Sequence, residues 1–126
     1  IGVFKGWFDE YYQEALENGY AKIPMFWREN LLLSKKWFDD IRDTTPMMGL
    51  RMYEGPILAI AGDKDELVPY YHAKEIVENS KNENSKTVIV KNSNHTFNVL
   101  MPNESKANDV IEQTIQWINK VLMMNR

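Results

Sequence analysis

The run Pro-Ile-Leu-Ala-Ile-Ala at residues 56–61 limits most strongly what this chain can fold into. It shows no alternation of polar and apolar residues, and it is bounded by Gly55 and Gly62. A short apolar run of this kind is typical of a strand that is buried on both faces, as in a parallel sheet. We therefore expect a buried strand here, flanked by helices.

Three more segments follow this run with short links between them. Residues 70–80 have the spacing of an amphipathic helix, residues 87–90 form a second apolar strand, and residues 105–124 form a closing amphipathic helix. A strand, a helix, a strand and a helix in this order make a βαβα unit, whose strands are parallel and whose crossover is right-handed. The sequence therefore predicts an α/β fold.

The first part of the chain has a different pattern and is rich in aromatic residues. Apolar side chains recur at spacings of three and four over residues 3–18, which predicts an amphipathic helix that ends at Gly19. Residues 22–33 contain a proline and favour a short irregular strand or a hairpin. Ser34 is well placed to cap a second helix, which should run to about residue 43.

The composition excludes several classes of protein. Of the 126 residues, 44% are apolar and the formal charge is -3, so the chain can build a core and has no electrostatic reason to bind nucleic acid or an anionic membrane. The absence of cysteine excludes disulfides, thiolate metal sites and a cysteine nucleophile. The two histidines lack metal-ligand spacing, so we expect no metal and no other cofactor. A cysteine-free chain is compatible with a reducing cytoplasm, and we predict a cytoplasmic location.

Two polar loops, residues 62–69 and 91–97, follow the two predicted strands. Neighbouring parallel strands lie about 5 Å apart, and their carboxyl ends meet at one edge of the sheet. An acidic side chain of the first loop can therefore meet His95 in the second loop. A carboxylate that faces an imidazole fixes its tautomer and stabilises the imidazolium, which is what a general base needs.

The residues of these loops resemble the acid and histidine motifs of the α/β-hydrolases. Gly62, Asp65, Val68 and Pro69 match a Gly-x-x-Asp-x-x-Val-Pro pattern that follows the penultimate core strand in many members of that family, and the histidine loop ends in a similar His-x-Phe. The resemblance covers roughly residues 50–125. It implies that Asp65 is the acid of a catalytic triad and His95 its general base.

Plainer interpretations of these residues remain open. Asp63 and Asp65 suit a turn after a strand, and His95 suits a loop with no catalytic role. If the loop does hold a catalytic acid, Asp63 is the second choice. His72 lies on the predicted helix 70–80 and is interpreted as a surface residue.

The family's nucleophile has no counterpart in the sequence. In α/β-hydrolases a serine occupies a Gly-x-Ser-x-Gly turn and precedes the acid and the histidine. None of the five serines has this context; they are Ser34, Ser80, Ser85, Ser93 and Ser105. We therefore expect the nucleophile to lie upstream, so that this chain is the C-terminal portion of a hydrolase and is inactive by itself.

The first part of the chain stands where many esterases of this fold insert a lid. Residues 30–41 resemble the lid edge and following helix of small bacterial acyl esterases, including cinnamoyl-ester hydrolases. The resemblance implies a mainly helical lid at residues 1–45 and a hydrolase core at residues 46–126. It also implies an apolar or aromatic acyl pocket that contains Trp7, Phe8, Trp27 and Phe97. The alternative is that the aromatic residues of the first part simply form a packed core.

The predicted function is cleavage of a small-molecule carboxylic ester through a Ser-His-Asp triad. Two alternatives are a non-catalytic α/β interaction module and a hydrolase with an aspartate nucleophile, of the dehalogenase or epoxide hydrolase type. Because the strand at 56–61 should have a free edge, we also expect the chain to self-associate, either through that edge or by swapping the lid segment.

Overall fold

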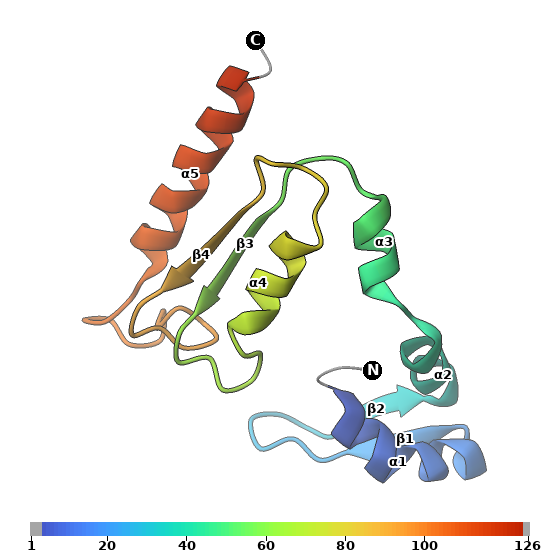
Figure 1. The fold of residues 1–126 in the computed structure, drawn as a ribbon. Coiled ribbons are helices and arrows are strands. Elements are labelled where there is room, and N and C mark those ends of the chain that lie inside the picture. The colour runs from blue at the N-terminus through green and yellow to red at the C-terminus, as the bar shows by residue number, and fades with distance from the viewer. Residues whose placement is uncertain (1–3, 125–126) are drawn as a thin grey trace. The chain divides into compact units, whose positions relative to one another are not determined.

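The computed structural model describes residues 4–124 and divides the chain into two compact units, Ile1–Thr45 and Pro46–Arg126 (Figure 1). No helix within residues 4–124 is long and apolar enough to cross a membrane. The cytoplasmic location stays a prediction.

The first unit is a β-hairpin with a helix on either side of it in the sequence. Its elements are α1 (Lys5–Asn18), β1 (Tyr20–Ile23), β2 (Leu31–Ser34) and α2 (Lys35–Asp43). The strands pair antiparallel, with Tyr20 opposite Ser34 and Ile23 opposite Leu31. Gly19 ends α1 in a left-handed conformation, with φ of 81°, and its N–H donates to the Ala15 carbonyl at 2.9 Å. The predicted helices and the hairpin are confirmed.

Ser34 caps α2 as the sequence predicted. Its hydroxyl accepts a hydrogen bond from the Trp37 N–H at 3.2 Å, which satisfies one of the free donors at the start of the helix. Five apolar side chains form the buried core of the unit: Ala15, Ala21, Ile23, Leu33 and Phe38. The aromatic side chains of α1 and α2 surround this core, so the unit has a hydrophobic core of its own.

The second unit contains the parallel strands. Its elements are α3 (Pro46–Met52), β3 (Leu58–Gly62), α4 (Tyr71–Glu78), β4 (Lys86–Val90) and α5 (Ala107–Met124). β3 and β4 pair in parallel, from Leu58 opposite Lys86 to Gly62 opposite Val90. Both α4 and α5 pack against the strand pair (Figure 1). The predicted βαβα unit and the α/β fold class are confirmed.

The expectation that the first strand is buried on both faces is wrong for this structure. The strand begins at Leu58, and of its five residues Ala59 and Gly62 are buried while the others are partly exposed. Within the described residues β3 pairs with β4 alone, and two helices cover a two-stranded sheet incompletely. Helix α5 likewise exposes an apolar stripe: Ile111, Ile115, Ile118 and Leu122.

Candidate active site

The loops that follow β3 and β4 are bonded to each other through their backbones. The Asp63 N–H donates to the Val90 carbonyl at 3.0 Å, and the Lys64 N–H donates to the Ser93 carbonyl at 2.9 Å. Gly62 approaches the second loop so closely that an added Cβ would lie 2.1 Å from the Ser93 carbonyl oxygen. Glycine at position 62 therefore lets the two loops lie side by side.

This arrangement brings Asp65 and His95 together. Asp65 Oδ2 lies 2.9 Å from His95 Nδ1. The other carboxylate oxygen, Oδ1, accepts backbone hydrogen bonds from Leu67 at 2.9 Å and from Val68 at 2.8 Å. The Asp65 side chain is 7% exposed and the His95 side chain 49% exposed. When Nδ1–H donates to this carboxylate, the free lone pair of the ring is on Nε2, which is the arrangement of a general base.

The pKa of Asp65 reflects this environment. Burial by itself raises the pKa of the carboxyl group, but hydrogen bonds from the Val68 N–H, the His95 ring and the Leu67 N–H outweigh burial. Together they hold the pKa of Asp65 below its usual range. Asp65 is therefore a carboxylate at neutral pH, as the partner of an imidazolium must be.

We expect Asp65 to stabilise the fold at neutral pH and to lose this contribution in acid. A carboxyl group whose pKa is lowered by folding contributes stability above its unfolded-state pKa, and the contribution disappears as the pH falls through the folded-state value. Urea unfolding should show Asp65→Asn to be less stable than wild type at pH 7, with a difference that shrinks below about pH 4. A difference that stays constant into strong acid would contradict this prediction.

Asp63, the second choice for the acid, lies elsewhere in the same loop. Its Oδ1 accepts a hydrogen bond from the Ser93 N–H at 3.3 Å, and its Oδ2 lies 3.7 Å from Lys91 Nζ. Asp63 thus connects the two loops, while Asp65 faces the imidazole. The geometry favours Asp65 over Asp63 as the partner of His95.

A mainly apolar hollow of about 290 Å³ lies beside the pair. Its lining includes Asp65, His95, Phe97, His72 and Ile76. The position of His72 was not predicted, because the sequence indicated a surface residue. The sequence did contain one indication of this position, because His72 lies in the first turn of the helix that follows the acid loop.

The other proposed substrate residues lie in the first unit. Trp7 and Phe8 are partly buried and pack against its core, with the Phe8 and Phe38 rings 6.2 Å apart. Trp27 is 62% exposed in the hairpin loop, where it packs edge-on against Phe26. Phe97, in contrast, lines the hollow beside Asp65 and His95. The roles of Trp7, Phe8 and Trp27 as substrate contacts stay predictions.

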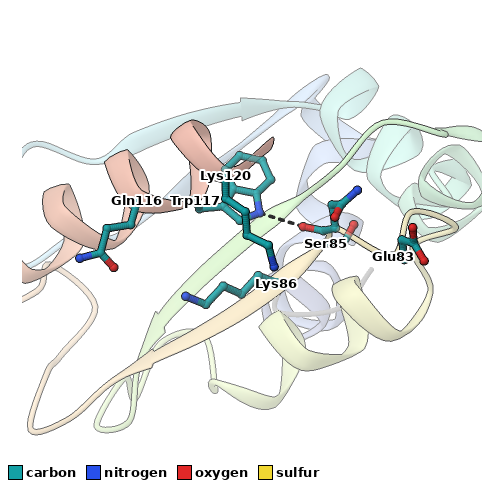
Figure 2. Close-up of a pocket in the computed structure, with 7 residues that line it drawn as sticks. Glu83, Ser85, Lys86, Gln116, Trp117 and Lys120 are labelled. Atoms are coloured by element: carbon teal, nitrogen blue, oxygen red, sulfur yellow. Dashed lines mark hydrogen bonds between the residues drawn. The ribbon is translucent and has the colours of Figure 1, made fainter. Parts of the chain in front are cut away.

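A second hollow lies near the amino end of β4 (Figure 2). Trp117 of α5 donates from Nε1 to the Asn84 carbonyl at 2.9 Å, and Lys86 and Lys120 also line the hollow. This hydrogen bond anchors α5 to the loop before β4. His95 follows the opposite end of the strand, so this hollow is separate from the acid and histidine.

The five serines all lie within the described residues, and their hydroxyl groups form hydrogen bonds to partners other than His95. Ser34 caps α2, Ser80 and Ser85 bond to each other at 2.6 Å, and Ser105 accepts from the Ala107 N–H. Ser93 is fully buried. Within residues 4–124 we also find no group of three or more acidic or imidazole side chains that could hold a metal ion.

Parallel strands with flanking helices, and an acid and a histidine after their carboxyl ends, define part of an α/β-hydrolase. The model of the prolyl oligopeptidase family matches residues 6–125, nearly the whole chain. The chain therefore belongs to this family of α/β-type serine hydrolases. A comparison with curated proteins gives no match. The resemblance to α/β-hydrolases is thus confirmed at the level of the superfamily.

Proposed function

We propose that this chain supplies the acid and the general base of a serine hydrolase that cleaves carboxylic esters. The observation that carries the proposal is the 2.9 Å contact between Asp65 Oδ2 and His95 Nδ1, with the carboxylate fixed by two backbone amides. The nucleophilic serine comes from outside the 126 residues, since no serine here has the Gly-x-Ser-x-Gly context.

The chemistry follows from the positions of the two ring nitrogens. The serine hydroxyl attacks the ester carbonyl while His95 Nε2 takes its proton, and the imidazolium then gives the proton to the leaving alcohol. Asp65 holds the ring through Nδ1 and stabilises its positive charge. Water then hydrolyses the acyl-enzyme by the same proton transfers in the second half of the reaction.

The apolar hollow beside the pair supports an apolar or aromatic acyl group as the substrate. Phe97 lines this hollow and is the proposed contact in the second unit. Trp7, Phe8 and Trp27 of the first unit, the proposed lid, are the other proposed substrate contacts. Because Trp7 and Phe8 pack in the core of that unit, Trp27 is the aromatic residue most available for a substrate.

A second candidate function is cleavage of peptide bonds, which the name of the matched family supports. Both reactions use the same acid, base and serine, so the geometry of Asp65 and His95 fits either one. The non-catalytic alternative is disfavoured, because the carboxylate and the imidazole point at each other. A serine-hydrolase family also favours a serine over an aspartate nucleophile.

The test is a direct comparison of ester and peptide substrates. A protein that joins this chain to its nucleophile-bearing residues should hydrolyse alkyl esters of aromatic acids and leave peptides intact, and His95→Ala should abolish turnover. The 126-residue chain alone should not hydrolyse p-nitrophenyl acetate. Cleavage of the peptides would overturn the ester assignment. Activity of the isolated chain that depends on His95 would place the nucleophile within it.

We also propose that the 126-residue chain self-associates through the free edge of β3 or by exchange of residues 1–45. Within the described residues β3 bonds to β4 alone, and an unpaired strand edge is a template for pairing with another chain. Light scattering should show a dimer whose population rises with concentration, and Ile115→Lys on α5 should leave it intact. A monomer at high concentration would contradict the proposal, and loss of the dimer in Ile115→Lys would assign the interface to α5.

A further inference from the structure

The loop that carries His95 is a tight turn held by side-chain amides. Asn94 Oδ1 accepts hydrogen bonds from the Thr96 N–H at 3.0 Å, the Thr96 hydroxyl at 3.1 Å and the Asn98 N–H at 2.9 Å. In return, Asn98 Oδ1 accepts from the Asn94 N–H at 3.0 Å. Two asparagines thus bracket the histidine with reciprocal bonds, much as a capping box closes the start of a helix.

Asn98 also anchors this turn to the chain on both sides of it. The residue is 4% exposed, and its Nδ2 donates to the Asn92 carbonyl at 2.7 Å and to the Glu104 carbonyl at 3.3 Å. Asn92 lies just after β4, and Glu104 lies just before α5. A single buried amide therefore joins the histidine turn to both neighbouring elements, and its donors and acceptor are all paired.

The backbone of this loop is strained. Asn92, Phe97 and Asn98 all have left-handed conformations, with φ of 53°, 53° and 56°. Asparagine tolerates this region well, whereas it is unusual for phenylalanine. Strain of this kind persists where surrounding contacts hold it, and it concentrates at functional sites. The hydrogen bonds of Asn98 are contacts of this type.

We propose that Asn98 is the positioning residue of His95, since its buried amide sets where the imidazole lies against Asp65. This inference rests on the proposed catalytic roles of Asp65 and His95. Asn98 does not line the hollow beside the pair, so it acts through the turn and touches neither the reacting groups nor the substrate space.

The two asparagines use their amides in opposite ways, which makes the proposal testable. Asn94 acts through its oxygen as an acceptor of three bonds, so Asn94→Asp should keep the turn while Asn94→Ala should lose it. Asn98 acts through its nitrogen as a donor to two carbonyls, so Asn98→Asp would place carboxylate oxygen against carbonyl oxygen in a buried site. If the two asparagines only filled polar space in the loop, Asn94→Asp and Asn98→Asp should have the same effect.

The first measurement uses NMR on the 126-residue chain. Wild type and Asn94→Asp should show the downfield Nδ1–H proton of His95 bonded to Asp65, and Asn98→Asp and Asn98→Gly should lose it. In both Asn98 variants the pKa of Asp65 should move upward toward its ordinary value, because the bond from His95 contributes to its lowering. Asn92→Gly is the matched control, since Asn92 is exposed and has the same left-handed backbone.

Preservation of the His95 proton in Asn98→Gly would overturn the proposal, as would equal responses of Asn94→Asp and Asn98→Asp. If the Asn98 variants fail to fold, the Asn94 pair tests the reciprocal bonds through which Asn98 would act on the turn: Asn94→Ala must lose the proton that Asn94→Asp keeps. Retention of the proton by both Asn94 variants would mean that the reciprocal bonds between Asn94 and Asn98 do not hold His95 in place.

The second measurement separates this inference from the proposed function. In the protein that carries the nucleophile, Asn98→Gly should lower kcat by roughly tenfold to a hundredfold with little change in KM, because a small displacement of the base is costly. If His95→Ala has no effect on kcat, the proposed function fails whatever Asn98 does. If His95→Ala abolishes turnover but Asn98→Gly keeps full kcat, the positioning inference alone fails.

Discussion

Asp65→Asn is expected to lower kcat of the nucleophile-bearing protein by about 10⁴-fold. The amide can donate a hydrogen bond to Nδ1, which favours the tautomer whose proton is on Nε2, where the serine proton must be accepted. The substitution also removes the negative charge that stabilises the imidazolium. Because the variant keeps the size of the side chain, KM should change little, and the loss should appear in kcat under saturating ester.

Asp63→Asn is the matched control for this prediction. Asp63 lies in the same loop, but its contacts are the Ser93 N–H and the Lys91 ammonium group, which lie away from the imidazole. Its loss should cost less than about tenfold in kcat, since a surface ion pair and one backbone hydrogen bond contribute little. A loss at Asp63 equal to that at Asp65, or full activity of Asp65→Asn, would refute the assignment of the acid.

That Asp65 rather than Asp63 faces His95 could be predicted from the sequence, because the acid motif describes a local structure. The spacing from Asp65 to Val68 lets the chain turn back, so that the Leu67 and Val68 N–H groups both bond to one carboxylate oxygen. The second oxygen is then left to face the histidine loop. Asp63 has no such turn after it. The order of strand, helix and strand also placed the two loops at one edge of the sheet.

The surroundings of the pair could not be predicted in the same way. Helical periodicity identified the apolar side of α4, but it did not show that His72 would line the hollow beside His95. Asn98 is one of several asparagines near the histidine, so the sequence does not single it out. Its side chain bonds to the backbone carbonyls of Asn92 and Glu104, and because every residue type has such a carbonyl, no sequence pattern marks these partners. How far β3 is buried depends on the elements that cover it, and the amino-acid composition of the strand does not show which elements those are.

Gly62→Ala is expected to destabilise the second unit by about 3 kcal/mol, near the upper end of the usual cost of overpacking. An added Cβ would lie 2.1 Å from the Ser93 carbonyl oxygen, 2.6 Å from the Ser93 carbonyl carbon and 2.8 Å from the Asn94 carbonyl oxygen. These are backbone atoms, which cannot rotate aside as a flexible side chain can. Relief therefore requires the two loops to separate, and separation breaks the Lys64–Ser93 backbone bond.

Gly49→Ala supplies a control with the opposite sign. Gly49 lies within α3, and an added Cβ there has no neighbouring atom within 4 Å. Alanine should raise the free energy of unfolding by up to about 1 kcal/mol, because it favours the helical backbone more than glycine does. Urea unfolding of both variants measures the difference, and NMR of Gly62→Ala should show a weakened His95 to Asp65 hydrogen bond. If Gly62→Ala were as stable as wild type, close approach at Gly62 would not be what joins the acid loop to the histidine loop.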